Sequence, residues 1–168
     1  MVDWEAVAEF RRRSNHPMHP HSQGSAEQPE TFFQHREASN KNYEEFTDIV
    51  VEYMNHVNQK LGTDYKPFNY YGAQDAVEII VAMGSVCDAA EEVVDYLNAQ
   101  GKKVGLVKVH LYRPFSPEYL VRVIPETVKR IAVLDRTKEP GSIGEPLYLD
   151  IVAALRGTAF EKTTIVGG

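Results

Sequence analysis

The residues of this chain best suited to chemistry lie in one loop, residues 135–146. Two basic side chains follow a strand-like run there, and two glycines precede a helical pattern. Free amides at a helix start, with nearby cations, suit a phosphate or carboxylate. The loop lacks the ending of a P-loop and the spacing of a dinucleotide fingerprint, so packing against another domain is the alternative. The residues concerned are Asp135, Arg136, Thr137, Lys138, Gly141, Ser142 and Gly144.

Two neighbouring loops offer further candidates. Ser85 precedes a helical run and has an acidic residue three positions on, which predicts a helix cap, with a phosphate contact as the alternative. Arg113 is held extended by the proline after it, so its guanidinium should project from the sheet end into an interface or a local salt bridge. Lys108 and His110 share one side of a strand, which we expect to be exposed or covered by something outside this chain.

The histidines and the cysteine suggest less specific chemistry. His16, His19 and His21 resemble a metal-binding tract, but the two prolines between them predict an extended segment with a structural or incidental role. Cys87 lies near a helix start, where a thiol pKa can be lowered. Because no general base can be assigned to it, we interpret Cys87 as a small buried residue.

Composition excludes several classes of protein. The 168 residues carry a formal net charge of -6, which gives no general field for holding nucleic acid. The single cysteine excludes an intrachain disulfide framework and a four-thiolate iron–sulfur site built from this chain alone. No signal peptide or membrane span is evident in the sequence. A cytoplasmic, reducing setting is therefore expected.

Hydrophobic periodicity predicts the elements that position these loops. The first third reads as helical, with an apolar stripe along residues 43–61, and the helix at 88–100 should bury Ala89, Val93, Val94 and Leu97. From residue 68 strands and helices alternate, which predicts a largely parallel sheet with helices on both faces and a ligand edge at the strand ends. Predicted helices are 3–13, 29–39, 43–61, 88–100, 116–123 and 146–155, and predicted strands are 68–71, 77–83, 104–111, 130–135 and 163–166.

Four motifs in these loops closely resemble the pyruvate:ferredoxin (flavodoxin) oxidoreductase family. The upstream segment from residue 24 to residue 43 is also similar, so the resemblance covers nearly the whole chain. The motifs are residues 81–85 (VAMGS), 111–115 (LYRPF), 133–141 (VLDRTKEPG) and 144–148 (GEPLY).

The resemblance implies a fold and a domain division. In that family the matching region is similar to the C-terminal domain of transketolase, a three-layer α/β/α sandwich on a mixed, mostly parallel five-stranded sheet with one antiparallel strand. We therefore expect an α/β domain at residues 67–168 and an N-terminal helical or extended arm, residues 1–66, that packs on it. The end at Gly168, directly after a strand, indicates a piece of a longer polypeptide, with a separate subunit as the alternative.

The resemblance also implies a function for the parent enzyme. Such an enzyme oxidatively decarboxylates pyruvate with thiamine diphosphate and magnesium, passes electrons through iron–sulfur clusters to ferredoxin or flavodoxin, and transfers the acetyl group to coenzyme A; a homodimeric parent is expected. The reactive cofactors belong to other domains, so this chain should be non-catalytic and bind none of them alone. It should aid domain assembly and coenzyme A binding, with no membrane or nucleic-acid partner. A purely structural module is the alternative.

Overall fold

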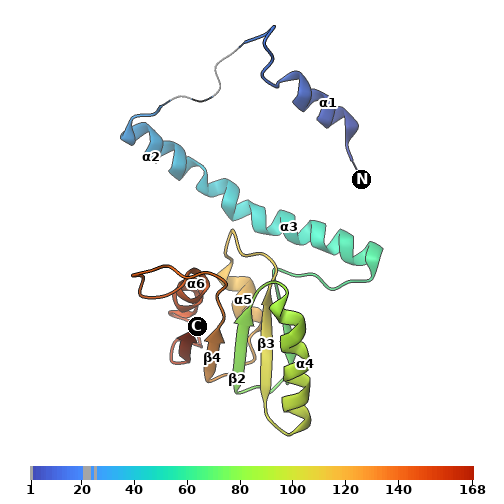
Figure 1. Cartoon of the computed structure of the whole chain (residues 1–168), viewed down its shortest axis with the longest axis vertical. Helices are drawn as coiled ribbons and strands as arrows, with labels where there is room; N and C mark the ends of the chain where they lie inside the picture. Colours follow the sequence, from blue (N-terminus) through green and yellow to red (C-terminus); the bar gives the residue numbers. More distant parts are fainter. Residues whose placement is uncertain (1, 21–23, 25) are drawn as a thin grey trace. The chain divides into compact units, whose positions relative to one another are not determined.

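A computed structural model describes residues 2–20, 24 and 26–168 of the chain (Figure 1). As the sequence predicts, helices occupy the first third and strands alternate with helices after it. The helices are α1 (Trp4–Arg12), α2 (Pro29–Ala38), α3 (Asn40–Leu61), α4 (Val86–Ala99), α5 (Pro117–Val123) and α6 (Pro146–Leu155). The strands are β1 (Phe68–Gly72), β2 (Glu78–Ala82), β3 (Val104–Val109), β4 (Arg130–Val133) and β5 (Thr164–Gly167).

The strands form one mixed sheet in the order β1-β3-β2-β4-β5. β1 is antiparallel to β3, and the β3–β2, β2–β4 and β4–β5 pairs are all parallel. The expected five-stranded, mostly parallel mixed sheet is confirmed. Because β2, β3, β4 and β5 point the same way, the loops that follow them leave from one edge of the sheet, here called the carboxyl edge.

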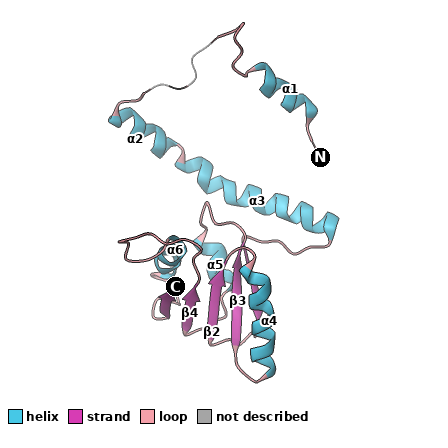
Figure 2. Cartoon of the chain, in the orientation of Figure 1, coloured by secondary structure: helices cyan, strands magenta, loops and turns pink. Residues whose placement is uncertain are grey.

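Helices pack on both faces of the sheet, as expected for the three-layer sandwich (Figure 2). On one face α5 and α6 cover the main core, in which Leu120, Ile151 and Leu155 lie against Phe68 and Val133. On the other face α4 packs over β3 and β1 and forms a smaller cluster. Both layers follow from strands that are apolar on their two sides.

The chain divides into two compact units, of which one ends at Asn40 and the other runs Lys41–Gly168. In the second unit α3 is tied to α5 by a hydrogen bond of 3.0 Å that the Tyr119 hydroxyl donates to Asp48. The domain boundary expected between residues 66 and 67 stays a prediction. None of the helices in the described ranges has both the length and the apolar character that crossing a bilayer requires.

Two predicted apolar stripes form but are covered less than expected. In α4 Val94 is buried, but Val93 is 53% exposed and Ala89 is also exposed, so the inner stripe expected for this helix is only partly inside. Along α3 the predicted stripe, together with Tyr65, lines a shallow apolar groove, in which Tyr53 is 66% exposed. Periodicity places residues on one face of a helix but does not specify what covers that face.

We predict a sharp contrast between adjacent positions of α6. Ile151 is fully buried and Val152 is 40% exposed. Ile151→Ala should lower the free energy of unfolding by about 2–5 kcal/mol because it leaves a cavity in the main core. Val152→Ala, the matched control, should cost under about 1 kcal/mol. Urea denaturation of both variants checks this, and equal losses would contradict the assigned packing.

Candidate functional site

The loops after β2 and β4 meet at the carboxyl edge. Gly84, in the turn between β2 and α4, has a φ of +78°, and a Cβ added there would lie 3.2 Å from Nη1 of Arg136. The Arg136 guanidinium therefore lies against the start of the segment that leads into α4, beside Ser85. Arg136 is exposed, and no described carboxylate forms an ion pair with it. The structure thus brings Arg136 and Ser85, two of the predicted candidates, to one place.

The amides at the start of α6 are not free for a ligand. Asp135, at the end of β4, accepts hydrogen bonds from the amides of Leu147 at 2.9 Å and Tyr148 at 3.0 Å. A carboxylate at the positive end of a helix is stabilising, so the chain's own anion occupies the position that the sequence offered to a phosphate. Sequence reasoning missed this role because the two amides are twelve and thirteen residues away from Asp135.

Lys138 is also engaged within the loop. Its ammonium group lies 2.5 Å from Oε1 of Glu145, and the Glu139 amide donates to Oε2 of the same carboxylate at 2.7 Å. The Glu145 side chain is only 9% exposed, whereas that of Lys138 is 80% exposed. The hydrogen bond from Lys138, and then the one from the Glu139 amide, lowers the pKa of Glu145. The Glu145 carboxylate therefore holds residues 138–139, near the start of the loop, against its end.

The middle of the loop is open to solvent. Gly141 has a φ of +83°, which a side chain would strain, and Ser142 donates a hydrogen bond of 2.6 Å to the Gly144 carbonyl. Thr137 is exposed, whereas Gly144 packs against the Tyr148 ring. Ile143, a residue that the sequence analysis did not select, is 96% exposed at this point. In the sequence, an isolated aliphatic residue between serine and glycine was the signal that could have singled out Ile143.

Arg113 forms the local salt bridge that was one of its two alternatives. Its Nη1 lies 2.7 Å from Oδ2 of Asp150 in α6, and its guanidinium stacks over the Tyr112 ring at 4.0 Å. Burial, followed by a hydrogen bond with Asp150, raises the pKa of Tyr112. The Arg113 side chain remains 55% exposed, and its guanidinium is held by α6 rather than projecting freely from the sheet end.

The helix cap predicted for Ser85 is wrong. Ser85 occupies the N-cap position of α4, but its backbone is helical, with φ -64° and ψ -17°, and its side chain makes no capping hydrogen bond. An N-cap residue is normally extended, which lets the side chain reach back to the first amides. α4 also begins at Val86, two residues before its predicted start. The Ser85 hydroxyl is consequently available at the carboxyl edge.

The expectation for Lys108 needs a similar correction, whereas His110 is exposed, which was one of its two alternatives. Lys108 forms an ion pair with Glu91 of α4, so its partner lies within this chain, and both side chains are about three-quarters buried. The His110 ring contacts Tyr65 edge-on at a centroid distance of 5.5 Å. Nothing outside the chain is needed to explain these two residues at the end of β3.

The histidine tract does not gather a metal site in the described residues. His16 and His19 form a tight turn, in which the His19 amide donates to the His16 carbonyl at 2.8 Å, and His21 lies outside the described residues. Across residues 2–20, 24 and 26–168 no three histidine, cysteine or acidic side chains converge as metal ligands would. Cys87 is 6% exposed, and burial raises its pKa, so its prediction as a small buried residue is confirmed.

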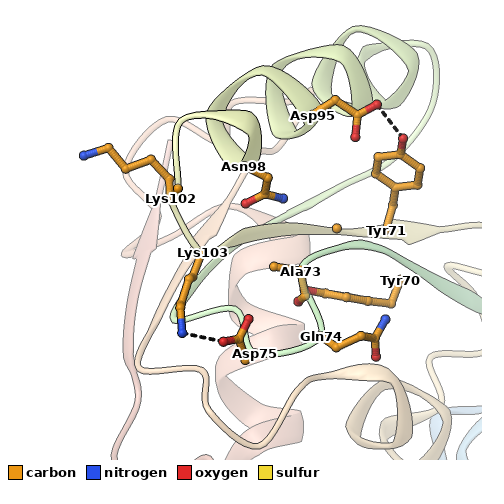
Figure 3. Close-up of a pocket in the computed structure, with 11 residues that line it drawn as sticks. Tyr70, Tyr71, Ala73, Gln74, Asp75, Asp95, Asn98, Lys102 and Lys103 are labelled. Atoms are coloured by element: carbon orange, nitrogen blue, oxygen red, sulfur yellow. Dashed lines mark hydrogen bonds and ion pairs between the residues drawn. The ribbon is translucent and has the colours of Figure 1, made fainter.

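A hollow of about 760 Å³ lies at the end of the sheet opposite the carboxyl edge (Figure 3). Its polar groups largely satisfy one another: Lys103 pairs with Asp75, and the Tyr71 hydroxyl donates to Asp95 at 2.8 Å. Burial, with a contribution from the Asp75 carboxylate, raises the pKa of Tyr70 to about 12. These contacts hold β1 against α4 and the start of β3, so we assign this hollow a structural role.

The topology and the carboxyl edge together define an α/β domain that presents an exposed guanidinium at its strand ends. Residues 76–168 match the family model described as pyruvate:ferredoxin oxidoreductase core domain II. The chain therefore belongs to the pyruvate:ferredoxin oxidoreductase family, which confirms the resemblance found in its motifs.

Curated relatives extend over the whole chain. It is 52% identical over 168 residues to a pyruvate-flavodoxin oxidoreductase of Enterobacter agglomerans and 50% identical over 168 residues to a pyruvate:ferredoxin oxidoreductase of Moorella thermoacetica. In each case the match covers 100% of this chain and 14% of the relative. The chain thus spans a small part of the length of these relatives.

The chain is also similar to a solved structure, a 2-oxoglutarate:ferredoxin oxidoreductase from Magnetococcus marinus. It shares 18% sequence identity, with a TM-score of 0.42 over 61% of this chain and 16% of that one. The strand order and pairing described above define the fold of this chain.

We predict that Asp135 stabilises the start of α6. Asp135→Ala removes the acceptor of two amides and should lower the free energy of unfolding by about 1 kcal/mol, within the range of roughly 0.5–2 kcal/mol for lost caps. Asp135→Asn keeps one oxygen acceptor and should lose less. Urea denaturation of both variants measures the difference. Equal stability of wild type and the alanine variant would show that the cap contributes nothing.

We predict that Glu145 adds a pH-dependent stability to the loop. Its pKa in the folded chain is lowered below the ordinary value of 4.5, so its contribution is present above that value and is lost as the pH falls through the lowered one. The difference in Tm between wild type and Glu145→Gln should therefore shrink as the pH falls below the ordinary value of 4.5. Glu161→Gln, at an exposed carboxylate, is the control and should show no such convergence.

Proposed function

We propose that the chain is a non-catalytic domain of an enzyme that oxidatively decarboxylates pyruvate, and that its carboxyl edge contributes to binding coenzyme A. The supporting observation is the Arg136 guanidinium, which is exposed against Gly84 without an ion pair to any described carboxylate. A planar guanidinium suits a phosphate because it can donate two parallel hydrogen bonds. Coenzyme A carries three phosphate groups, so one cation of this kind can bind one end of the molecule.

The other candidate residues take supporting roles in this proposal. Asp135 and Glu145 already occupy the α6 amides and Lys138, so Arg136 has to make the principal charge contact. The hydroxyls of Ser85 and Thr137 are donors that a phosphate can use, whereas the Ser142 hydroxyl would first have to leave the Gly144 carbonyl. Gly141 is exposed, and the Lys138 side chain is largely exposed although its ammonium group is paired with Glu145, so a phosphate has room to approach this part of the loop.

The reactive parts of the enzyme are assigned to other domains. A thiolate-bound iron–sulfur cluster needs about four cysteines, and this chain has only Cys87. We therefore propose that thiamine diphosphate, magnesium and the clusters bind elsewhere in a longer, homodimeric, cytoplasmic enzyme that passes electrons to ferredoxin or flavodoxin. The direct partners of this chain are then the other domains of that enzyme.

A purely structural domain is the second candidate. It is favoured by the number of charges at the carboxyl edge that are satisfied internally, in particular Arg113 with Asp150 and Lys138 with Glu145. In this alternative Arg136 contacts a neighbouring domain instead of a ligand.

A titration of coenzyme A into the 168-residue chain separates the two candidates. If the edge binds the coenzyme, amide chemical shifts should move at residues 84–85 and 136–144, and Arg136→Ala should weaken binding by about tenfold or more, the effect of losing one charged hydrogen bond. Lys102→Ala, at the opposite end of the sheet, is the control and should leave binding unchanged. Shifts that are absent, or that are insensitive to Arg136, would favour the structural domain.

A further inference from the structure

An apolar groove lies on the α4 side of the sheet, away from the candidate site. α4 covers β1 and β3, but no helix of the second unit covers β2, β4 and β5 on this side, which faces the viewer in Figure 2. The groove has a volume of about 570 Å³ and a largely aliphatic lining. Ile80, Ala132 and Val166 form its floor, and Val86, Ala89 and Val93 of α4 form its wall.

The floor is continuous across three strands. Ile80 is paired with Ala132 in the β2–β4 register, and Ala132 is paired with Val166 in the β4–β5 register. Residues paired in this way point to the same side of a sheet, so their side chains form one row. Val166 is 55% exposed and Val93 is 53% exposed, whereas Val81 and Val133 on the opposite face are fully buried. One face of the sheet is therefore only half covered.

The dimensions of the groove match those of a single helix. α4 has 14 residues, which corresponds to a length of about 21 Å. Three adjacent strands span roughly 10 Å, which is the separation of two packed helices. Small residues on the wall and floor, Ala89, Ala90 and Ala132, allow a backbone to approach closely.

We propose that one amphipathic α-helix, from a part of the family polypeptide outside residues 1–168, docks in this groove beside α4 and completes the second helical layer. The inference rests on the proposed function, because it requires the chain to be one domain of a longer polypeptide. This chain covers 14% of the length of two relatives, so most of the polypeptide of those relatives lies outside the matching region.

Charged residues beside the groove indicate which side chains the docking helix should carry next to α4. Glu92, three residues after the wall residue Ala89 on α4, is exposed and forms no ion pair within the described residues. At the far end of the floor, Glu78 is already paired with Arg130. The docking helix should therefore carry lysine or arginine on the side next to α4 and aliphatic residues on the side that faces Ile80.

The area of the groove argues against a second copy of this chain as its occupant. A groove no longer than α4, about 21 Å, and roughly 10 Å wide offers a footprint of at most roughly 200 Å², compared with about 800 Å² per partner in a stable interface between separate proteins. A helix of the same polypeptide needs less area because the linker keeps its effective concentration in the millimolar range.

Cysteine accessibility tests the proposal. Val93→Cys places a thiol on the wall, and Ala99→Cys, at an exposed α4 position that does not line the groove, is the matched control. Each variant is made in the 168-residue chain and in the longer family polypeptide that contains it, and labelling by a fluorescent maleimide is timed in the native state. The natural Cys87 is buried and gives the background rate.

In the 168-residue chain both introduced thiols should react at similar rates. In the longer polypeptide Val93→Cys should react at least about tenfold more slowly, because docking leaves the groove open only a small fraction of the time, while Ala99→Cys is unchanged. Equal rates for Val93→Cys in the two lengths would overturn the proposal. Protection in the 168-residue chain that disappears on dilution would overturn it in favour of a second copy. The coenzyme A titration reports on the carboxyl edge and the cysteine labelling reports on the groove. The failure of one proposal can therefore be distinguished from the failure of the other.

Discussion

The carboxylate of Asp135 is the contact on which the geometry of the carboxyl edge depends. It joins the end of β4 to the first amides of α6, and α6 in turn buries Leu147, Ile151 and Leu155 in the main core. The loop between them is closed at its base and leaves Arg136 beside Gly84. A free anion at the helix start would have to displace a covalently tethered carboxylate, so anion binding is shifted to the guanidinium next to it.

Much of the fold was predictable from the sequence because it is set by local patterns. Short apolar runs separated by helical periodicity identified the five strands, and their spacing indicated parallel pairing. The presence of one antiparallel strand came from the family resemblance, and only the structure shows that it is β1, since the residues of a short strand look alike in either direction. The partners of Lys108 and Asp135 were not predictable, because each lies twelve or more residues away and is brought close only by tertiary packing.

Coverage of the helix and sheet faces was another feature that local patterns did not determine. Val93 and Val94 look equivalent in the sequence, yet one is 53% exposed and the other 4% exposed, because α4 sits over β3 and β1 rather than over the centre of the sheet. The failed cap at Ser85 has a related cause, since the backbone there is already helical and directs the hydroxyl away from the first amides. At Val93 and at Ser85 the residue type suggested a role, burial or capping, but the position of α4 and the local backbone conformation determined that neither role is filled.

The energetics of the carboxyl edge imply that a coenzyme site here is shared between domains. One charged hydrogen bond contributes about 1.5–3 kcal/mol, whereas even millimolar affinity requires about 4.1 kcal/mol. The nearby carboxylates of Asp135 and Glu145, together with a net charge of -6, oppose further anion binding. Arg136 and the neighbouring hydroxyls can therefore bind the coenzyme only weakly in the isolated chain, at a strength that a chemical-shift titration still detects, and the free energy for tighter binding must come from a surface that a neighbouring domain supplies.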